Sequence, residues 1–444
     1  MDPVTTGRRR KDTTRWLQLA ATGRPAPFRL GGPAYLAALG GWVAAAVLLL
    51  AAAPELVRTT VSDGTVVAAA HTVGLVVFPF AVAAAVWQLV PVMLRNDPPR
   101  PWTRWIVLPL LAAGAPLAAA VAAGNGRLGA LFAVLLGAGL VLLLAELAAL
   151  IRGAPAGRTL VVSRPAVALA GAHAAAAFAL GALVFADSGP EPLGVPYERL
   201  LLVHVALAFV GWLSVLIAAV GRTLVPMLGL AASAPPRRAP VAELVLVAGL
   251  WLSVAGLATS TDGLLALGVV VVLAGLAAPA RTFLRVARTG TIGLREGPAA
   301  HVTLGLWFFL QAAVLALLAA AGAAAERRAA VAAVLLLGIG WAAGTILGHL
   351  GKLISLSAWG SWPPGPRPKQ AELYPRRGWQ AEVLLFAPGV QLLAAGVVAE
   401  SVTTARAGGV LLTAAALVAL ACGVETVRRA GRGLASHALP SEAP

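Results

Sequence analysis

Charged side chains are scarce in this chain. Only 12% of its 444 residues are Asp, Glu, Lys or Arg, and 59% are hydrophobic, whereas roughly 25% of the residues of a soluble domain are charged. So few charges cannot cover a globular surface, and most of the exterior must therefore face lipid. The composition excludes an ordinary soluble domain.

Cysteine is almost absent as well. The single cysteine, Cys422, lies inside an apolar run, which excludes a disulfide framework and a metal cluster held by thiolates. The sequence also lacks a glycine-rich phosphate loop, paired carboxylates and a hydrolase constellation, so we assign no catalytic residue. The net charge of +16 does not predict a nucleic-acid partner, because basic residues of a membrane protein hold its topology at the cytoplasmic face.

Long apolar runs, in contrast, recur along the whole chain. Each is long enough to cross a hydrocarbon core of ~30 Å as a helix, which predicts an all-α polytopic membrane protein with a single transmembrane domain at 34–428. The twelve predicted spans lie near 34–54, 65–94, 104–123, 128–151, 165–185, 199–227, 241–259, 263–285, 300–322, 329–354, 381–400 and 407–428.

The basic residues predict the orientation of these spans. With the tails at 1–33 and 429–444 inside, 28 Lys and Arg lie on or near the cytoplasmic side and 6 on the other side. Such an excess is typical of cytoplasmic loops. We therefore expect a multi-pass protein of a bacterial cytoplasmic membrane, with the lipid bilayer as its main partner, both termini inside, and no nucleic acid bound. Glu146 and Arg222, near the inner ends of their spans, are expected to reach the interface.

A repeated stretch stands out among the spans. HTVGLVVFPFAVAAAVWQLVPVM begins at His71 in the second span, and HVALAFVGWLSVLIAAVGRTLVPM begins at His204 in the sixth. The tenth span carries His349 in GHLGKL. A histidine on every fourth span predicts three sets of four helices in a pseudo-threefold bundle, with the second, sixth and tenth spans lining interior cavities.

The depth of the histidines divides them into two groups. His71 and His204 lie about five residues into their spans, so roughly 8 Å below the outer boundary at 1.5 Å per residue, whereas His349 lies roughly 30 Å down. His173 and His301 join His349 in a loose inner group, with His301 expected at the interface.

Intramembrane imidazoles face the protein interior and have partners, and neutral histidine binds haem iron and copper. The outer pair, His71 and His204, is therefore the candidate metal site, and His349 is a further candidate cofactor ligand. The alternative for each histidine is a structural hydrogen bond between helices.

These segments carry a resemblance to a known family. HTVGLVVFPF, HVALAFVGWLSVLIAAVGRTLVPML and GHLGKLISLSAW, on twelve spans, resemble haem-copper oxidase subunit I-like membrane proteins, and NnrS-type haem and copper proteins are a neighbouring family. In the oxidases, histidines of the second and tenth helices bind the low-spin haem, and the sixth helix supplies a copper ligand. His71, His349 and His204 match these three helices.

The resemblance implies a haem b or a copper ion, held near the outer face through His71 and His204. It implies a role in electron transfer, in haem or copper handling, or in sensing, together with an electron-transfer or oxidase-assembly partner protein.

Oxygen reduction is not expected, because the chain departs from the oxidase pattern. His204 is followed by Val205-Ala206-Leu207, where the oxidases have Pro-Glu-Val-Tyr. The seventh span has no histidine and the tenth has one, so a dinuclear haem-copper centre cannot be assembled.

Two other classes remain open. Twelve spans with internal repeats are also typical of a secondary transporter. A structural or assembly subunit, whose histidines are only hydrogen-bonded and hold no cofactor, is the third possibility. The visible absorption spectrum of the purified protein separates these classes.

Overall fold

The computed structural model describes residues 28–91, 100, 102–153, 164–186, 195–229, 239–289, 297–322, 325–362 and 368–438. Met93, most of the predicted tail at 1–33 and the end of the predicted tail at 429–444 lie outside these ranges. Within them, the regular secondary structure is helical throughout.

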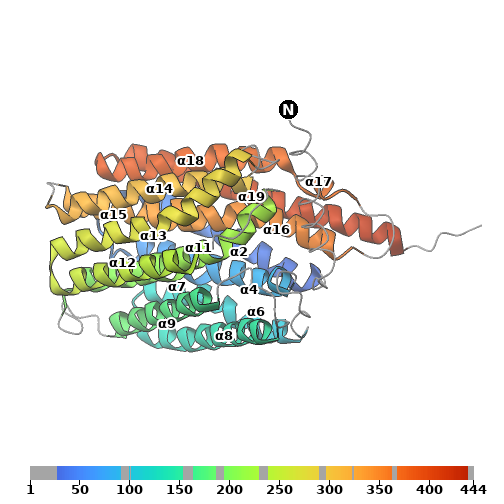
Figure 1. The fold of residues 1–444 in the computed structure, drawn as a ribbon, viewed down its shortest axis with the longest axis horizontal. Coiled ribbons are helices and arrows are strands. Elements are labelled where there is room, and N and C mark those ends of the chain that lie inside the picture. Colours follow the sequence, from blue (N-terminus) through green and yellow to red (C-terminus); the bar gives the residue numbers. More distant parts are fainter. Residues whose placement is uncertain are drawn as a thin grey trace, which may run out of the picture.

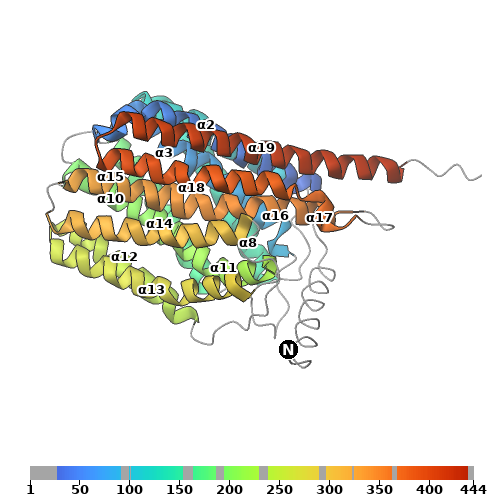
Figure 2. The same cartoon turned by 90° about the horizontal axis from the view of Figure 1, so that it is seen from above.

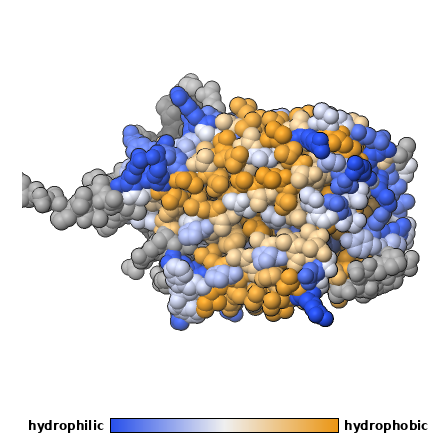
Figure 3. All heavy atoms as spheres, turned by 180° about the vertical axis from the view of Figure 1, so that it is seen from behind, coloured by the Kyte–Doolittle hydropathy of each residue, from blue (hydrophilic) through white to orange (hydrophobic). Residues whose placement is uncertain are grey.

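In the described ranges, twelve helical spans are long and apolar enough to cross a membrane, as predicted. They run side by side along the long axis of the molecule (Figures 1 and 2), and an apolar band separates hydrophilic ends on the face seen in Figure 3. Most spans are single helices: α2 (Phe28–Val57), α8 (Gly126–Arg152), α9 (Arg164–Ala186), α12 (Ala239–Thr259), α13 (Asp262–Thr289), α14 (Gly297–Ala320), α18 (Arg376–Val398) and α19 (Val402–Ala438). The third span is broken at Ala113 into α6 (Thr103–Ala112) and α7 (Gly114–Ala122).

The second, sixth and tenth spans share a π-helix near the middle. The second is α3 (Gly64–Thr72), η1 (Val73–Val77) and α4 (Phe78–Gln88); the sixth is α10 (Tyr197–Ala206), η3 (Leu207–Ser214) and α11 (Val215–Leu228); the tenth is α15 (Glu326–Leu335), η5 (Leu336–Ala343) and α16 (Gly344–Gly360). π-Helices are rare and frequently occur at functional sites. The three spans singled out by their histidines therefore also differ from the others in backbone geometry.

Aromatic side chains join these three spans in the middle of the bundle. The Phe78 ring lies edge-on to the rings of Phe209 and Trp212, with ring centres 6.4 and 6.2 Å away. The indole N–H of Trp341 donates to Ser214 Oγ at 2.8 Å. We call Phe78, Phe209, Trp212 and Trp341 the aromatic layer. Because Phe78 and Trp341 are fully buried, this layer fixes the three spans against one another.

The tenth span is the central helix of the bundle. In its most apolar stretch of 18 residues, 78% of the residues are buried, against 22% in the fourth and fifth spans. The fourth and fifth spans therefore lie at the perimeter.

Close backbone contact holds α12 against α13. A Cβ on Gly268 of α13 would lie 2.4 Å from the backbone nitrogen of Ser253 on α12, whereas a Cβ on Gly263 would meet no atom within 4 Å. The absence of a side chain at Gly268 thus sets the distance between these helices, as small residues commonly do in membranes.

We expect Gly268→Leu to lower the free energy of unfolding in detergent by about 1–3 kcal/mol, because overpacking forces a backbone shift of that cost. The matched control is Gly263→Leu on the same helix, which should unfold as the wild type does. Equal unfolding transitions for the two variants would contradict the proposed role of this contact.

The connection between the tenth and eleventh spans is more ordered than predicted. The sequence predicts an irregular loop at 355–380, but α16 continues to Gly360, a short helix α17 spans Gln370–Leu373, and α18 begins at Arg376. Local bonds explain the difference, since Trp359 Nε1–H donates to the carbonyl oxygen of Pro368 at 3.0 Å. Residues 363–367 lie outside the described part of the chain.

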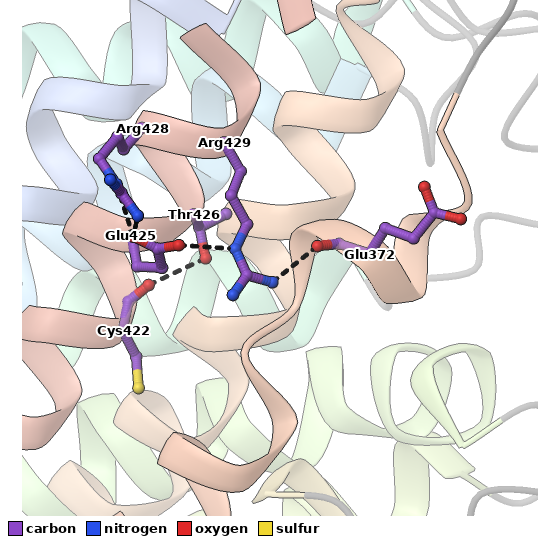
Figure 4. A network of polar contacts seen from close by, with 6 residues as sticks. All are labelled: Glu372, Cys422, Glu425, Thr426, Arg428 and Arg429. Carbon is purple, nitrogen blue, oxygen red and sulfur yellow. Dashed lines mark hydrogen bonds and ion pairs between the residues drawn. The ribbon is translucent and has the colours of Figure 1, made fainter. Parts of the chain in front are cut away.

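Helix α19 likewise continues to Ala438, past the predicted end of the span at 428. Glu425 accepts hydrogen bonds from Arg428 Nε at 2.7 Å and from Arg429 Nε at 2.8 Å (Figure 4). Pairs three or four residues apart stabilise an exposed helix. Arg429 also donates to the Glu372 carbonyl oxygen at 2.8 Å, which ties α17 to α19. Hydropathy alone could not detect this polar extension.

Candidate functional site

The structure places His71 and His204 side by side. Their ring centres are 6.4 Å apart, and the ring planes differ by only 19°. His71 lies in the last turn of α3, directly before η1, and His204 lies in the last turn of α10, directly before η3. The two histidines that open the repeated stretches are thus neighbours in space.

Each ring of this pair is fixed by a hydrogen bond to a backbone carbonyl. His71 Nδ1 lies 2.9 Å from the carbonyl oxygen of Val67, and His204 Nδ1 lies 2.9 Å from that of Ala177 on α9. A carbonyl oxygen can only accept, so Nδ1 carries the hydrogen in both rings and Nε2 keeps its lone pair. Histidines that bind metals through Nε2 are held in this tautomer in the same way.

The spacing of the pair suits one metal atom between the rings. Imidazole nitrogens bind metal ions at ~2.0 Å, so rings whose centres are 6.4 Å apart are close enough to share one ion. The lack of a side chain at Gly181 makes room for the His204 ring. A Cβ on Gly181 would lie 2.8 Å from His204 Cε1, and a Cβ on Gly74, one turn after His71, would meet no atom within 4 Å.

The number of protein ligands narrows the kinds of metal centre that fit. In the described part of the chain, no group of three or more His, Cys, Asp or Glu side chains could hold a metal ion. These residues therefore do not form a metal site with four protein ligands. Two imidazoles suffice for a haem iron, whose porphyrin supplies the other nitrogens, and for a copper ion of low coordination number.

A cavity lies on the other side of the aromatic layer. Its walls come from 81–90 of the second span, 216–225 of the sixth and 345–353 of the tenth, with a smaller part from α8 and α9. Its volume is about 170 Å³. We call this space the inner cavity. The three spans predicted to line an interior cavity do so.

His349 belongs to the inner cavity and not to the histidine pair. It follows Trp341 by about two turns, whereas His71 precedes Phe78 by about two turns, and the three spans run in the same direction (Figures 1 and 2). The aromatic layer therefore separates the two levels. His349 is 5% exposed, its Nδ1 lies 2.6 Å from the Thr345 carbonyl oxygen, and its buried Nε2 has no hydrogen-bond partner among the described residues.

The expectation that His301 lies at the interface is wrong. His301 is fully buried, and its Nε2 lies 2.6 Å from Oε2 of Glu382, which is 1% exposed. The lack of a side chain at Gly348 makes room for the ring, since a Cβ there would lie 2.4 Å from His301 Cβ. Sequence reasoning missed Glu382 because it stands at the predicted start of the eleventh span, where a carboxylate normally meets water.

Two other charged residues that were expected to reach the interface have partners on neighbouring helices. Arg222 forms an ion pair with the buried Glu243 of α12. Glu146 Oε2 accepts a hydrogen bond from Trp87 Nε1 at 2.7 Å. In each case a neighbouring helix supplies a partner, which the sequence of a single helix cannot reveal.

His173, the third of the predicted inner histidines, packs against a tryptophan. It is buried on α9, where its ring centre lies 5.9 Å from that of Trp251. A Cβ on Gly211 of η3 would lie 2.9 Å from His173 Cγ, so His173 packs against both α12 and the sixth span, and its grouping by depth with His301 and His349 stays a prediction.

The twelve apolar helices define an all-α polytopic membrane protein. A scan against protein-family models finds no match, and a search of curated proteins finds no match either. The function is therefore argued from the residues of the site.

Proposed function

We propose that this protein is a membrane cofactor protein in which His71 and His204 hold one metal centre, a haem b or a copper ion. Its role would be electron transfer, haem or copper handling, or sensing. The observation that carries this proposal is the geometry of the pair. Two nearly parallel imidazoles lie 6.4 Å apart, and each is held in the Nε2-binding tautomer by a carbonyl oxygen.

The chain's own residues would orient the ligands and exclude water. The bonds to Val67 and Ala177 hold the rings in place, and the aromatic layer closes the site toward the inner cavity. The bound metal would accept or release one electron. In the orientation predicted from the basic residues, the pair lies near the outer face of a bacterial cytoplasmic membrane, where a soluble electron carrier or an oxidase-assembly protein can approach. The same proposal includes a relationship of this chain to the oxidase subunit I-like proteins.

The visible spectrum and the metal content of the detergent-purified protein test this proposal. Cells are grown with added copper and a haem precursor. We expect either a Soret band that shifts on reduction with dithionite, with one haem per chain, or one copper per chain. A colourless preparation without stoichiometric metal would contradict the proposal.

One observation favours the transporter class as a second candidate. The buried pair of His301 and Glu382 joins α14 to α18 within the bundle, and ionisable pairs of this kind are typical of proton relays. On this alternative the purified protein carries no cofactor. In addition, Glu382→Gln should abolish proton uptake by proteoliposomes during transport, whereas His71→Ala should not.

A further inference from the structure

A pair of glutamines lies on the outer surface of the bundle, between the two ends of the apolar spans. Gln311 is on α14 and Gln391 is on α18, and these two helices lie side by side (Figures 1 and 2). Each glutamine is about two turns or more, so roughly 10 Å, from either end of its helix. Gln391 is exposed and Gln311 is half-buried. Their exposed neighbours Leu310, Val314 and Leu384 are apolar, so the pair is a polar spot on a surface that faces hydrocarbon.

The two amides use only part of their hydrogen-bonding capacity on each other. Gln311 Nε2 donates to Gln391 Oε1 at 3.1 Å, and Gln391 Nε2 donates to Gln311 Oε1 at 3.0 Å. A carboxamide has two N–H donors and an oxygen with two lone pairs. One donor and one lone pair of each amide therefore have no partner among the described residues, and lipid tails offer none. Such groups are costly in hydrocarbon, and a helix that brings a polar side chain to this spot relieves the cost.

The exposed residues of α18 form a narrow stripe that runs through Gln391. From residue 381 on, they follow one another at intervals of three, four, three and seven residues. This is the spacing of the contact positions in a left-handed pair of helices, which is the commoner arrangement of helices in membranes. We call this surface the α18 stripe; it consists of Ala381, Leu384, Pro388, Gln391 and Val398.

A second copy of this chain fits the α18 stripe by symmetry. Two copies are inserted with the same orientation, which the basic residues set, so a twofold axis between them runs along the membrane normal. A residue near this axis then meets its own counterpart at the same depth. Because a carboxamide is both donor and acceptor, Gln391 is complementary to itself. A different membrane protein would need a polar side chain at that depth, whereas a second copy always carries one.

We propose that two copies of this chain associate in the membrane through the α18 stripe, with the unused N–H and oxygen of Gln391 in one copy bonded to those of Gln391 in the other. Gln311 holds the Gln391 amide in position through the two reciprocal bonds. This contact involves neither the pair His71 and His204 nor the inner cavity, and it does not depend on the proposed metal centre.

The test is the oligomeric state of the full-length protein in liposomes, measured by single-molecule photobleaching of an attached fluorophore over a series of protein-to-lipid ratios. We expect a monomer–dimer equilibrium for the wild type and a dissociation constant about 10-fold higher for Gln391→Leu, as the loss of strong hydrogen bonds between helices predicts. Leucine at a lipid-facing position is compatible with folding. Val141→Leu, at an exposed position of the perimeter helix α8, should dimerise as the wild type does, and so should His71→Ala.

Cysteine cross-linking identifies the surface that is in contact. In a Cys422→Ala background, Leu384→Cys should give a disulfide-linked dimer when membranes are oxidised. The matched control is Val141→Cys, which should give none. Leu384 is 75% exposed and Val141 is 65% exposed, and both lie at a similar distance from the outer ends of their helices.

A protein that stays monomeric at every ratio, a dimer that Gln391→Leu does not weaken, or cross-linking through Val141→Cys in place of Leu384→Cys would overturn the proposal. A monomer that co-purifies with one other membrane protein would also overturn it, because the α18 stripe would then serve a different partner.

Discussion

Replacing His204 with alanine is expected to abolish the metal or haem content of the purified protein without preventing its insertion. The loss is expected because a single remaining imidazole cannot hold the centre. The affinity for the metal or haem should fall by more than ~100-fold, which is more than the loss of a residue that only orients a ligand causes. Insertion should be preserved because topology depends on the basic loops. His71→Ala should give the same result, as measured by absorption and metal analysis per mole of protein.

His173→Ala is the matched control for these variants, since His173 is also a buried histidine but its ring packs against Trp251. It should keep the full cofactor content. A His204→Gly variant should regain the cofactor when imidazole is added, because the space of the side chain is then open to the free ligand. If His71→Ala and His204→Ala both retain wild-type content, the pair is structural.

Replacing Glu382 with leucine should destabilise the protein by about 1–3 kcal/mol, the usual cost of leaving a buried polar group without its hydrogen-bond partner. The reason is that His301 is fully buried and would lose the carboxylate at its Nε2. The measurement is the free energy of unfolding in mixed detergent micelles.

The double variant His301→Leu with Glu382→Leu should be more stable than Glu382→Leu alone, because no polar group is then left unpaired. Glu198→Gln is the control. Its ion pair with Arg327 is largely exposed, and such pairs contribute only about 0–1 kcal/mol. A Glu382→Leu protein that unfolds like the wild type would contradict the structural role of the pair.

The spans and the outer pair could be predicted from the sequence because both depend on local patterns. An apolar run of sufficient length must cross the bilayer as a helix, whatever its neighbours are. His71 and His204 open the same repeated stretch, so equal positions on equivalent helices brought their rings together. The role of the pair in binding a cofactor stays a prediction.

The remaining features of the fold and the site depend on contacts between neighbouring helices, and the hydropathy of a single segment does not predict them. Glu382 seemed placed for water at the end of its span, but α14 supplies His301 as its partner. The π-helices contain a glycine such as Gly74 or Gly211, yet glycine is too frequent in this chain, at 48 residues, to mark them. The inner cavity forms where apolar side chains of separate spans face one another.

The most direct test of the central claim is electron paramagnetic resonance of the oxidised protein, prepared with histidine labelled with ¹⁵N. The account predicts a paramagnetic centre coupled to the nitrogens of two imidazoles. If the centre is a haem, its low-spin signal should be of the rhombic type that nearly parallel imidazole planes produce, as the angle of 19° between the rings requires. Substitution of either His71 or His204 should remove the coupling. A protein without a paramagnetic centre, or a centre whose spectrum shows no coupling to histidine nitrogen, would contradict the account.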